Sequence, residues 1–99
     1  MIIQEFEYTN ITLAAPTTTL ITTGKGILHS IIINKPLAGG SIAIYDNTAG
    51  SGTLIGTIVK PATLLSDVAQ SVIYDVKFGK GLTIVTSGAA QDITVAWQK

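Results

Sequence analysis

Short runs of apolar and β-branched residues alternate with polar positions along the chain, and glycine-rich segments separate the runs. The alternation is cleanest at residues 71–78, where Val72, Tyr74, Val76 and Phe78 fall on one face of an extended strand. Isoleucine, threonine and valine dominate the composition, and their stiff side chains suit pleated strands. Strands of this length, separated by turn signals every 8–12 residues or so, predict a β-sandwich or barrel.

We predict eight short strands, at Ile2–Tyr8, Thr17–Thr23, Ile27–Asn34, Ser41–Tyr45, Thr53–Lys60, Ser71–Phe78, Leu82–Thr86 and Asp92–Gln98. Apart from residues 62–70, the connections are short, and the chain contains no long amphipathic helix, which excludes parallel crossover units. The expected fold is all-β: one antiparallel β-sandwich of jelly-roll type over residues 1–99, whose closure protects the strand edges. Residues 62–70 are ambiguous, because their apolar spacing suits either one helical turn or a short crossing loop.

The same alternation assigns an inward face to each strand. The predicted core residues are Ile31, Ile33, Ile42, Ile44, Leu82, Ile84, Ile93 and Val95. Trp97 is in phase with Ile93 and Val95, which favours its burial in the core or in an interface.

Charge is sparse. Charged residues make up 12% of the chain, against about 25% in ordinary globular domains. Six lysines balance six acidic residues and arginine is absent, so we do not expect nucleic acid as a partner. Apolar runs are far shorter than the roughly 20 residues of a membrane-spanning helix, and no membrane is expected. Too few charges remain to cover so small a domain, which indicates that copies or partners cover part of its apolar surface.

No set of residues points to catalysis, to a cofactor or to a metal. The chain has no cysteine, and His29 is its only histidine, expected to pack or hydrogen-bond at a sheet face rather than act as a base. Asp46-Asn47-Thr48 lacks the spaced acidic ligands of a calcium loop and suits turn chemistry. Gly24-Lys25-Gly26 and Gly79-Lys80-Gly81 lack the following helix of a phosphate loop, so we predict β-turns there.

The aromatic residues leave an alternative open, because aromatic ring faces pack on the apolar faces of sugars. They are Phe6, Tyr8, Tyr45, Tyr74, Phe78 and Trp97. The alternative function is therefore a carbohydrate-binding or receptor-binding module. A lectin of this kind would place exposed aromatic rings beside paired Asp and Asn side chains.

Several sequence segments along the chain are similar to segments found in one group of proteins. They are Gly26–Asn34 (GILHSIIIN), Gly39–Thr53 (GGSIAIYDNTAGSGT), Ser71–Phe78, Gly81–Gly88 (GLTIVTSG) and Asp92–Val95. Over residues 24–97 the chain resembles small virion proteins of tailed bacteriophages. The resemblance implies a capsid-associated β-sandwich protein of the head-decoration or head-fibre type, bound to the major capsid protein or to another virion protein. It implies no catalytic or binding residues.

The expected function is accordingly that of a non-enzymatic viral structural protein on the capsid surface, soluble in the host cytoplasm before assembly. We expect a homo-oligomer, with a trimer favoured because capsids offer three-fold positions at which weak contacts add up. The N-terminal segment Met1–Tyr8 is the expected interface or swapped strand. Its candidate contact residues are Met1, Ile2, Ile3, Phe6 and Tyr8.

Overall fold

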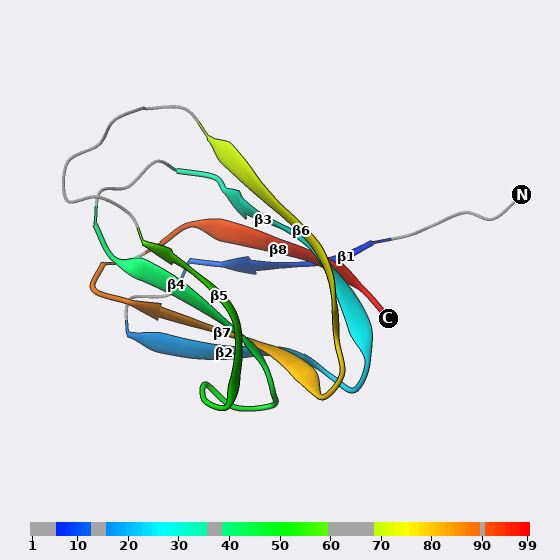
Figure 1. Cartoon of the computed structure of the whole chain (residues 1–99). Helices are drawn as coiled ribbons and strands as arrows, with labels where there is room; N and C mark the ends of the chain where they lie inside the picture. The colour runs from blue at the N-terminus through cyan, green and yellow to red at the C-terminus, as the bar shows by residue number, and fades with distance from the viewer. Residues whose placement is uncertain (1–5, 13–15, 36–38, 60–68, 90) are drawn as a thin grey trace, which may run out of the picture.

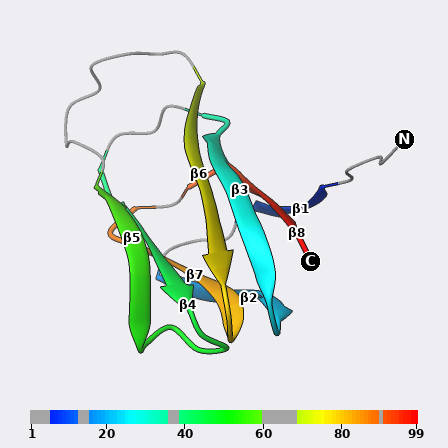
Figure 2. The same cartoon turned by 45° about the vertical axis from the view of Figure 1, so that its right-hand side comes forward.

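A computed structural model describes residues 6–12, 16–35, 39–59, 69–89 and 91–99. Eight strands form two four-stranded antiparallel sheets, which pack face to face as a sandwich (Figures 1 and 2). The predicted all-β sandwich is confirmed. The described residues contain no helix, and hence none long and apolar enough to cross a membrane.

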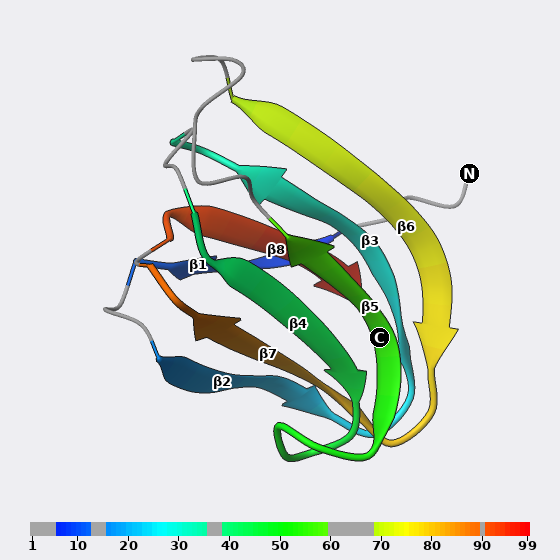
Figure 3. The ribbon, with the colours of Figure 1, turned by 60° about the vertical axis from the view of Figure 1, so that its left-hand side comes forward.

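The strands are β1 (Glu7–Ile11), β2 (Thr17–Thr23), β3 (Gly26–Ile33), β4 (Ser41–Asp46), β5 (Thr53–Val59), β6 (Gln70–Phe78), β7 (Gly81–Ser87) and β8 (Ile93–Gln98). Sheet A has the order β1-β8-β3-β6, and sheet B has the order β2-β7-β4-β5 (Figure 3). The first strand thus pairs with the last, the second with the seventh, the third with the sixth and the fourth with the fifth. One long antiparallel hairpin rolled into two layers gives this order, which is that of a jelly roll.

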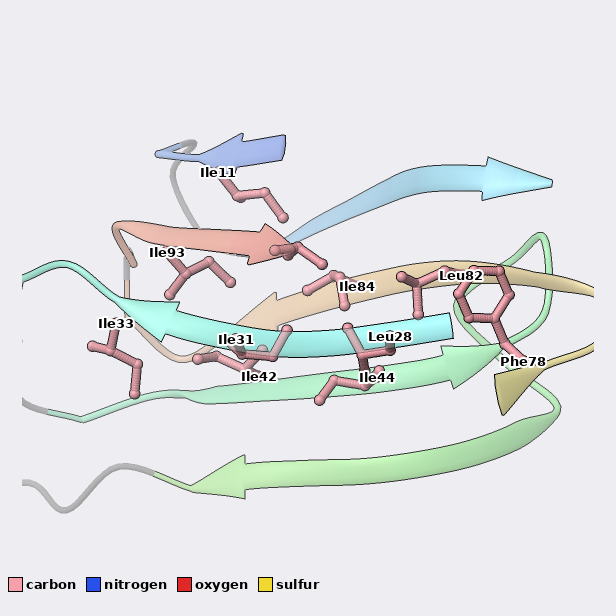
Figure 4. Packing of buried hydrophobic residues seen from close by; sticks show 11 residues of the cluster. Ile11, Leu28, Ile31, Ile33, Ile42, Ile44, Phe78, Leu82, Ile84 and Ile93 are labelled. Carbon is pink, nitrogen blue, oxygen red and sulfur yellow. The ribbon is translucent and has the colours of Figure 1, made fainter. Parts of the chain in front are cut away.

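The core fills the space between the two sheets (Figure 4). Its buried apolar side chains are Ile11, Leu28, Ile31, Ile33, Ile42, Ile44, Phe78, Leu82, Ile84, Ile93 and Val95. All eight predicted core residues are among them. On β6 the buried Phe78 and the partly buried Val72, Tyr74 and Val76 share one face, as their alternation predicts, and that face points into the sandwich.

The first strand differs from its prediction. The alternation of residues 2–8 predicts a strand over Ile2–Tyr8, but β1 begins at Glu7 and ends at Ile11. Residues 1–5 lie outside the described residues. The bounds of β1 follow from its pairing with β8, which places Ile11 opposite Ile93 and buries it in the core. Long-range pairing here decides the strand bounds that local alternation alone gets wrong.

The remaining described strand ends agree with the sequence prediction to within one residue. Of the ambiguous segment 62–70, residues 62–68 lie outside the described residues. Gln70 is the first residue of β6 and so is not part of a helical turn.

Candidate binding surfaces

The two sheets differ in charge. The four strands of sheet B contain one charged residue, Asp46, at the end of β4. The strands of sheet A contain Glu7, Asp75 and Lys77 and also His29. A sheet face that meets water is normally lined with polar and charged side chains, so sheet B departs from the usual pattern.

Edge strand β5 is the most apolar border of sheet B. Its register with β4 places three side chains on the outer face, and we call them the β5 surface: Leu54, Thr57 and Val59. Val59 is 75% exposed and Leu54 is half exposed. Edge strands are usually protected by charge, proline or a bulge, and the described residues of β5 offer only a bulge at Ile55.

The loop between β4 and β5 covers the middle of the same face. The Thr83 hydroxyl, on the outer side of β7, donates a 2.8 Å hydrogen bond to the Asn47 carbonyl and is fully buried. Gly50 lies so close to β7 that a Cβ there would be 2.7 Å from Cγ2 of Val85. The exposed apolar side chains of the outer face of sheet B therefore lie at its two edges, in the β5 surface and at the half-exposed Leu20 of β2.

Asp46 fixes the β4–β5 loop to the turn between β6 and β7. Its carboxylate accepts hydrogen bonds from the backbone amides of Lys80 at 2.8 Å and of Gly79 at 3.0 Å. These bonds, from Lys80 and then Gly79, lower the pKa of Asp46 below its ordinary value. The amides of the Gly79-Lys80 turn thus do bind an anion, and that anion is a carboxylate of the same chain.

The neighbouring Asn47 confirms the turn chemistry that the sequence predicts for this loop. Its side-chain amide donates to the Ser51 carbonyl at 2.6 Å, and its side-chain oxygen accepts from the Thr48 amide at 2.9 Å. Within the described part of the chain, no three His, Cys, Asp or Glu side chains gather as a metal site would require.

His29 lies on the outer face of sheet A in an unusual backbone setting. It is the extra residue of β3 relative to β8, and it faces two residues of β6, Tyr74 and Asp75. Asp75 has a φ of +50°, which non-glycine residues rarely adopt. The bulges turn the imidazole outward, where its Nδ1 lies 2.6 Å from Oδ1 of Asp75. His29 is therefore a hydrogen-bonded imidazole at a sheet face, as the sequence predicts.

Phe6, directly before β1, packs on this pair. Its ring stacks on the His29 imidazole with the centroids 4.6 Å apart and the planes inclined by 21°. The contact leaves Phe6 44% exposed. The His29–Asp75 pair thus contacts the residue directly before β1 on the outer face of sheet A.

The aromatic residues do not form one platform. Phe78 lies in the core, the partly buried Tyr74 and Trp97 pack against it, and Tyr45 lies on the outer face of sheet B. The indole Nε1 of Trp97 is buried with no hydrogen-bond partner among the described residues. Only Phe6 and Tyr8 share the outer face of sheet A, and Tyr8 is 77% exposed.

A polar cluster that sequence reasoning missed lies two positions further along that face. It consists of Asn10, Asn34, Asp92 and Thr94. The Asn10 amide donates to Oδ1 of Asp92 at 3.2 Å and to Oγ1 of Thr94 at 3.3 Å. The Asn34 amide donates to the same two atoms at 3.2 and 2.9 Å. These residues come from three strands or their ends, so only the pairing of β1 and β3 with β8 brings them together.

The predicted interface residues are only partly within the described chain. Met1, Ile2 and Ile3 lie outside it, whereas Phe6 and Tyr8 are exposed on the outer face of sheet A. The N-terminal interface therefore stays a prediction. Comparison of the chain with protein-family models, with curated proteins and with solved structures finds no match in any of the three.

Proposed function

We propose that this chain is a non-enzymatic structural protein of a virus particle, which self-associates and binds the particle through its protein surfaces. The observation that carries the proposal is the β5 surface, where Val59 and Leu54 are exposed on an edge strand with no charged residue. Such an edge is an aggregation hazard in a free monomer. Contact with another copy of the chain removes that hazard.

The arrangement of the strands suits a ring of copies. In sheet B, β5 and β2 are the two free edges, and neither contains a charged residue. Pairing of β5 with the β2 edge of the next copy would be a head-to-tail contact, and such contacts close into rings when the rotation allows. A trimer remains the favoured ring, because it matches the three-fold positions of a capsid.

Fold and resemblance support a virion role. Jelly rolls occur in viral capsid domains and in lectins, although a fold alone does not decide function. The resemblance of residues 24–97 to small virion proteins of tailed bacteriophages favours the capsid among these two. The partner would then be the major capsid protein or another virion protein.

Light scattering on Val59→Lys tests the self-association. The matched control is Ile73→Lys, which places the same charge on edge strand β6, where Ile73 is exposed and charged residues already occur. We expect the wild type and Ile73→Lys to have about three times the monomer mass of 10.3 kDa, and Val59→Lys to be monomeric because a lysine blocks an edge. A monomeric wild type at high micromolar concentration would refute self-association.

Deletion of residues 1–5 tests the predicted N-terminal interface separately. We expect the deletion to weaken the oligomer or its binding to viral shells more than it lowers the melting temperature. If the deletion leaves both unchanged, the N-terminal segment is not the interface. If Val59→Lys keeps the oligomer mass of the wild type, the β5 surface is not the interface between copies.

A further inference from the structure

We propose that the outer face of sheet A carries a binding site for a neutral sugar, with the exposed ring of Tyr8 beside the polar cluster of Asn10, Asn34, Asp92 and Thr94. The inference goes beyond the assembly function, because it uses the sheet opposite to the β5 surface. It is an alternative to the predicted N-terminal interface for Tyr8, the residue that both would use. It also names the residues that would bind a sugar if the alternative function, a carbohydrate-binding module, applies.

Tyr8 has the geometry of a stacking platform. At 77% it is the most exposed large apolar side chain among the described residues. Its cross-strand neighbour on β8 is Ala96, whose side chain is a single methyl group. An aromatic ring that keeps its face in water gains by packing on the apolar face of a sugar.

The polar cluster lies within reach of a sugar stacked on that ring. Tyr8 and Asn10 alternate with Thr9 on β1 and so point to the same side of the sheet. Two residues along a strand span about 7 Å, a distance that a pyranose ring and its hydroxyl groups can bridge. Thr94, opposite Asn10 on β8, extends the polar cluster toward β3.

Internal hydrogen bonds hold the cluster in place and leave binding capacity unused. Both amide nitrogens point at Oδ1 of Asp92 and Oγ1 of Thr94, and that of Asn10 also donates to the Ile93 carbonyl at 2.9 Å. The side-chain oxygens of Asn10 and Asn34 therefore point away and have no partner among the described residues. The Thr94 hydroxyl accepts both bonds and can still donate its own proton. Side chains already fixed in this way lose little entropy when a ligand binds.

The mixture of groups favours a neutral polyol over an ion. Lys35 Nζ lies 4.0 Å from Oδ2 of Asp92, too far for a hydrogen bond and near enough for a hydroxyl group to bridge the two. The opposite charges balance, so the site offers no net attraction to an anion or a cation. Each sugar hydroxyl both donates and accepts, which matches donors and acceptors placed side by side.

The test is an NMR titration of the isotope-labelled chain with maltotriose, cellotriose and chitotriose at millimolar concentrations. We expect saturable shifts of backbone amides in β1 and β8 with at least one of these sugars. Tyr8→Ala should weaken that binding about tenfold, whereas Tyr8→Phe should keep it because the ring face remains. The matched control is Ile73→Ala, which removes another exposed apolar side chain from the same face and should not change the affinity.

Three results would overturn the site. The first is the absence of saturable shifts with all three sugars, and the second is equal affinity of the wild type and Tyr8→Ala. The third is a changed oligomer mass for Tyr8→Ala by light scattering, which would place Tyr8 in a protein interface. The melting temperature of each variant shows that it is folded, since Tyr8 is exposed and its truncation should not disturb the core.

Discussion

Gly56 and Tyr74 lie close together across the sandwich. Their closeness predicts that Gly56→Ala destabilises the wild type but stabilises a variant that lacks the Tyr74 side chain. Gly56 lies on β5 opposite Ile44, on the inner face of sheet B. Tyr74 points inward from β6 of sheet A and packs against the core, and burial raises the pKa of its phenol. A Cβ on Gly56 would lie 2.8 Å from the hydroxyl oxygen and 3.2 Å from Cε1 of Tyr74.

Two opposing effects decide the stability of Gly56→Ala. The φ of Gly56 is not positive, so alanine fits the backbone and should stabilise by about 0.4–1 kcal/mol through the unfolded chain. Overpacking of the methyl group against Tyr74 should cost about 1–3 kcal/mol. We expect Gly56→Ala to destabilise the wild type by about 1–2 kcal/mol. In a Tyr74→Ala background the obstacle is gone, and the same change should stabilise.

Urea unfolding of the two single variants and the double variant measures this coupling. Trp97 is the only tryptophan and reports unfolding by its fluorescence. All proteins are compared at one concentration, because self-association adds stability by mass action. Equal effects of Gly56→Ala in both backgrounds would refute the contact of Tyr74 with β5, and with it this part of the inter-sheet packing.

Three further predictions concern the core, the hydrogen bonds of Asp46 to the turn between β6 and β7, which we call the clamp, and the bulge at His29. Ile44→Ala should cost about 2–5 kcal/mol in urea unfolding, and full tolerance of the change would show that Ile44 does not face the core. Asp46 has a lowered pKa, so its stabilisation is present above its ordinary value of 3.8 and lost as the pH falls through the folded pKa. The gap in melting temperature between wild type and Asp46→Asn should therefore be largest at neutral pH and close in acid, and a gap independent of pH would contradict the clamp. Asp75→Gly in a His29→Ala background should raise the melting temperature, because glycine adopts a φ of +50° at no steric cost; a lower melting temperature would contradict strain at Asp75.

Alternation is sufficient to predict the sandwich and eight of its eleven buried apolar residues. Ile42 and Ile44 on β4, and Ile93 and Val95 on β8, are buried as a period of two requires. Each strand has one inward face, so its own residues carry that information. The first strand is the exception, since β8 decides where β1 pairs and the sequence of β1 does not.

The features of the binding surfaces were less accessible from sequence, because they depend on register. A bulge at His29 shifts the inward face of β3, so that Leu28 and Ile31 both point to the core. No local signal marks this shift. The cluster of Asn10 with Asp92 joins residues 82 positions apart, and the clamp of Asp46 on Gly79 joins two turns that each look self-contained in sequence.

The most direct test of the proposed virion role is the protein content of purified particles. If the proposal holds, a virus encodes this chain, and the particles of that virus would be purified and their proteins quantified by mass spectrometry. We expect the chain in a fixed molar ratio to the major capsid protein. Particles that lack the chain, while infected cells contain it in the unassembled fraction, would contradict a structural role in the virion.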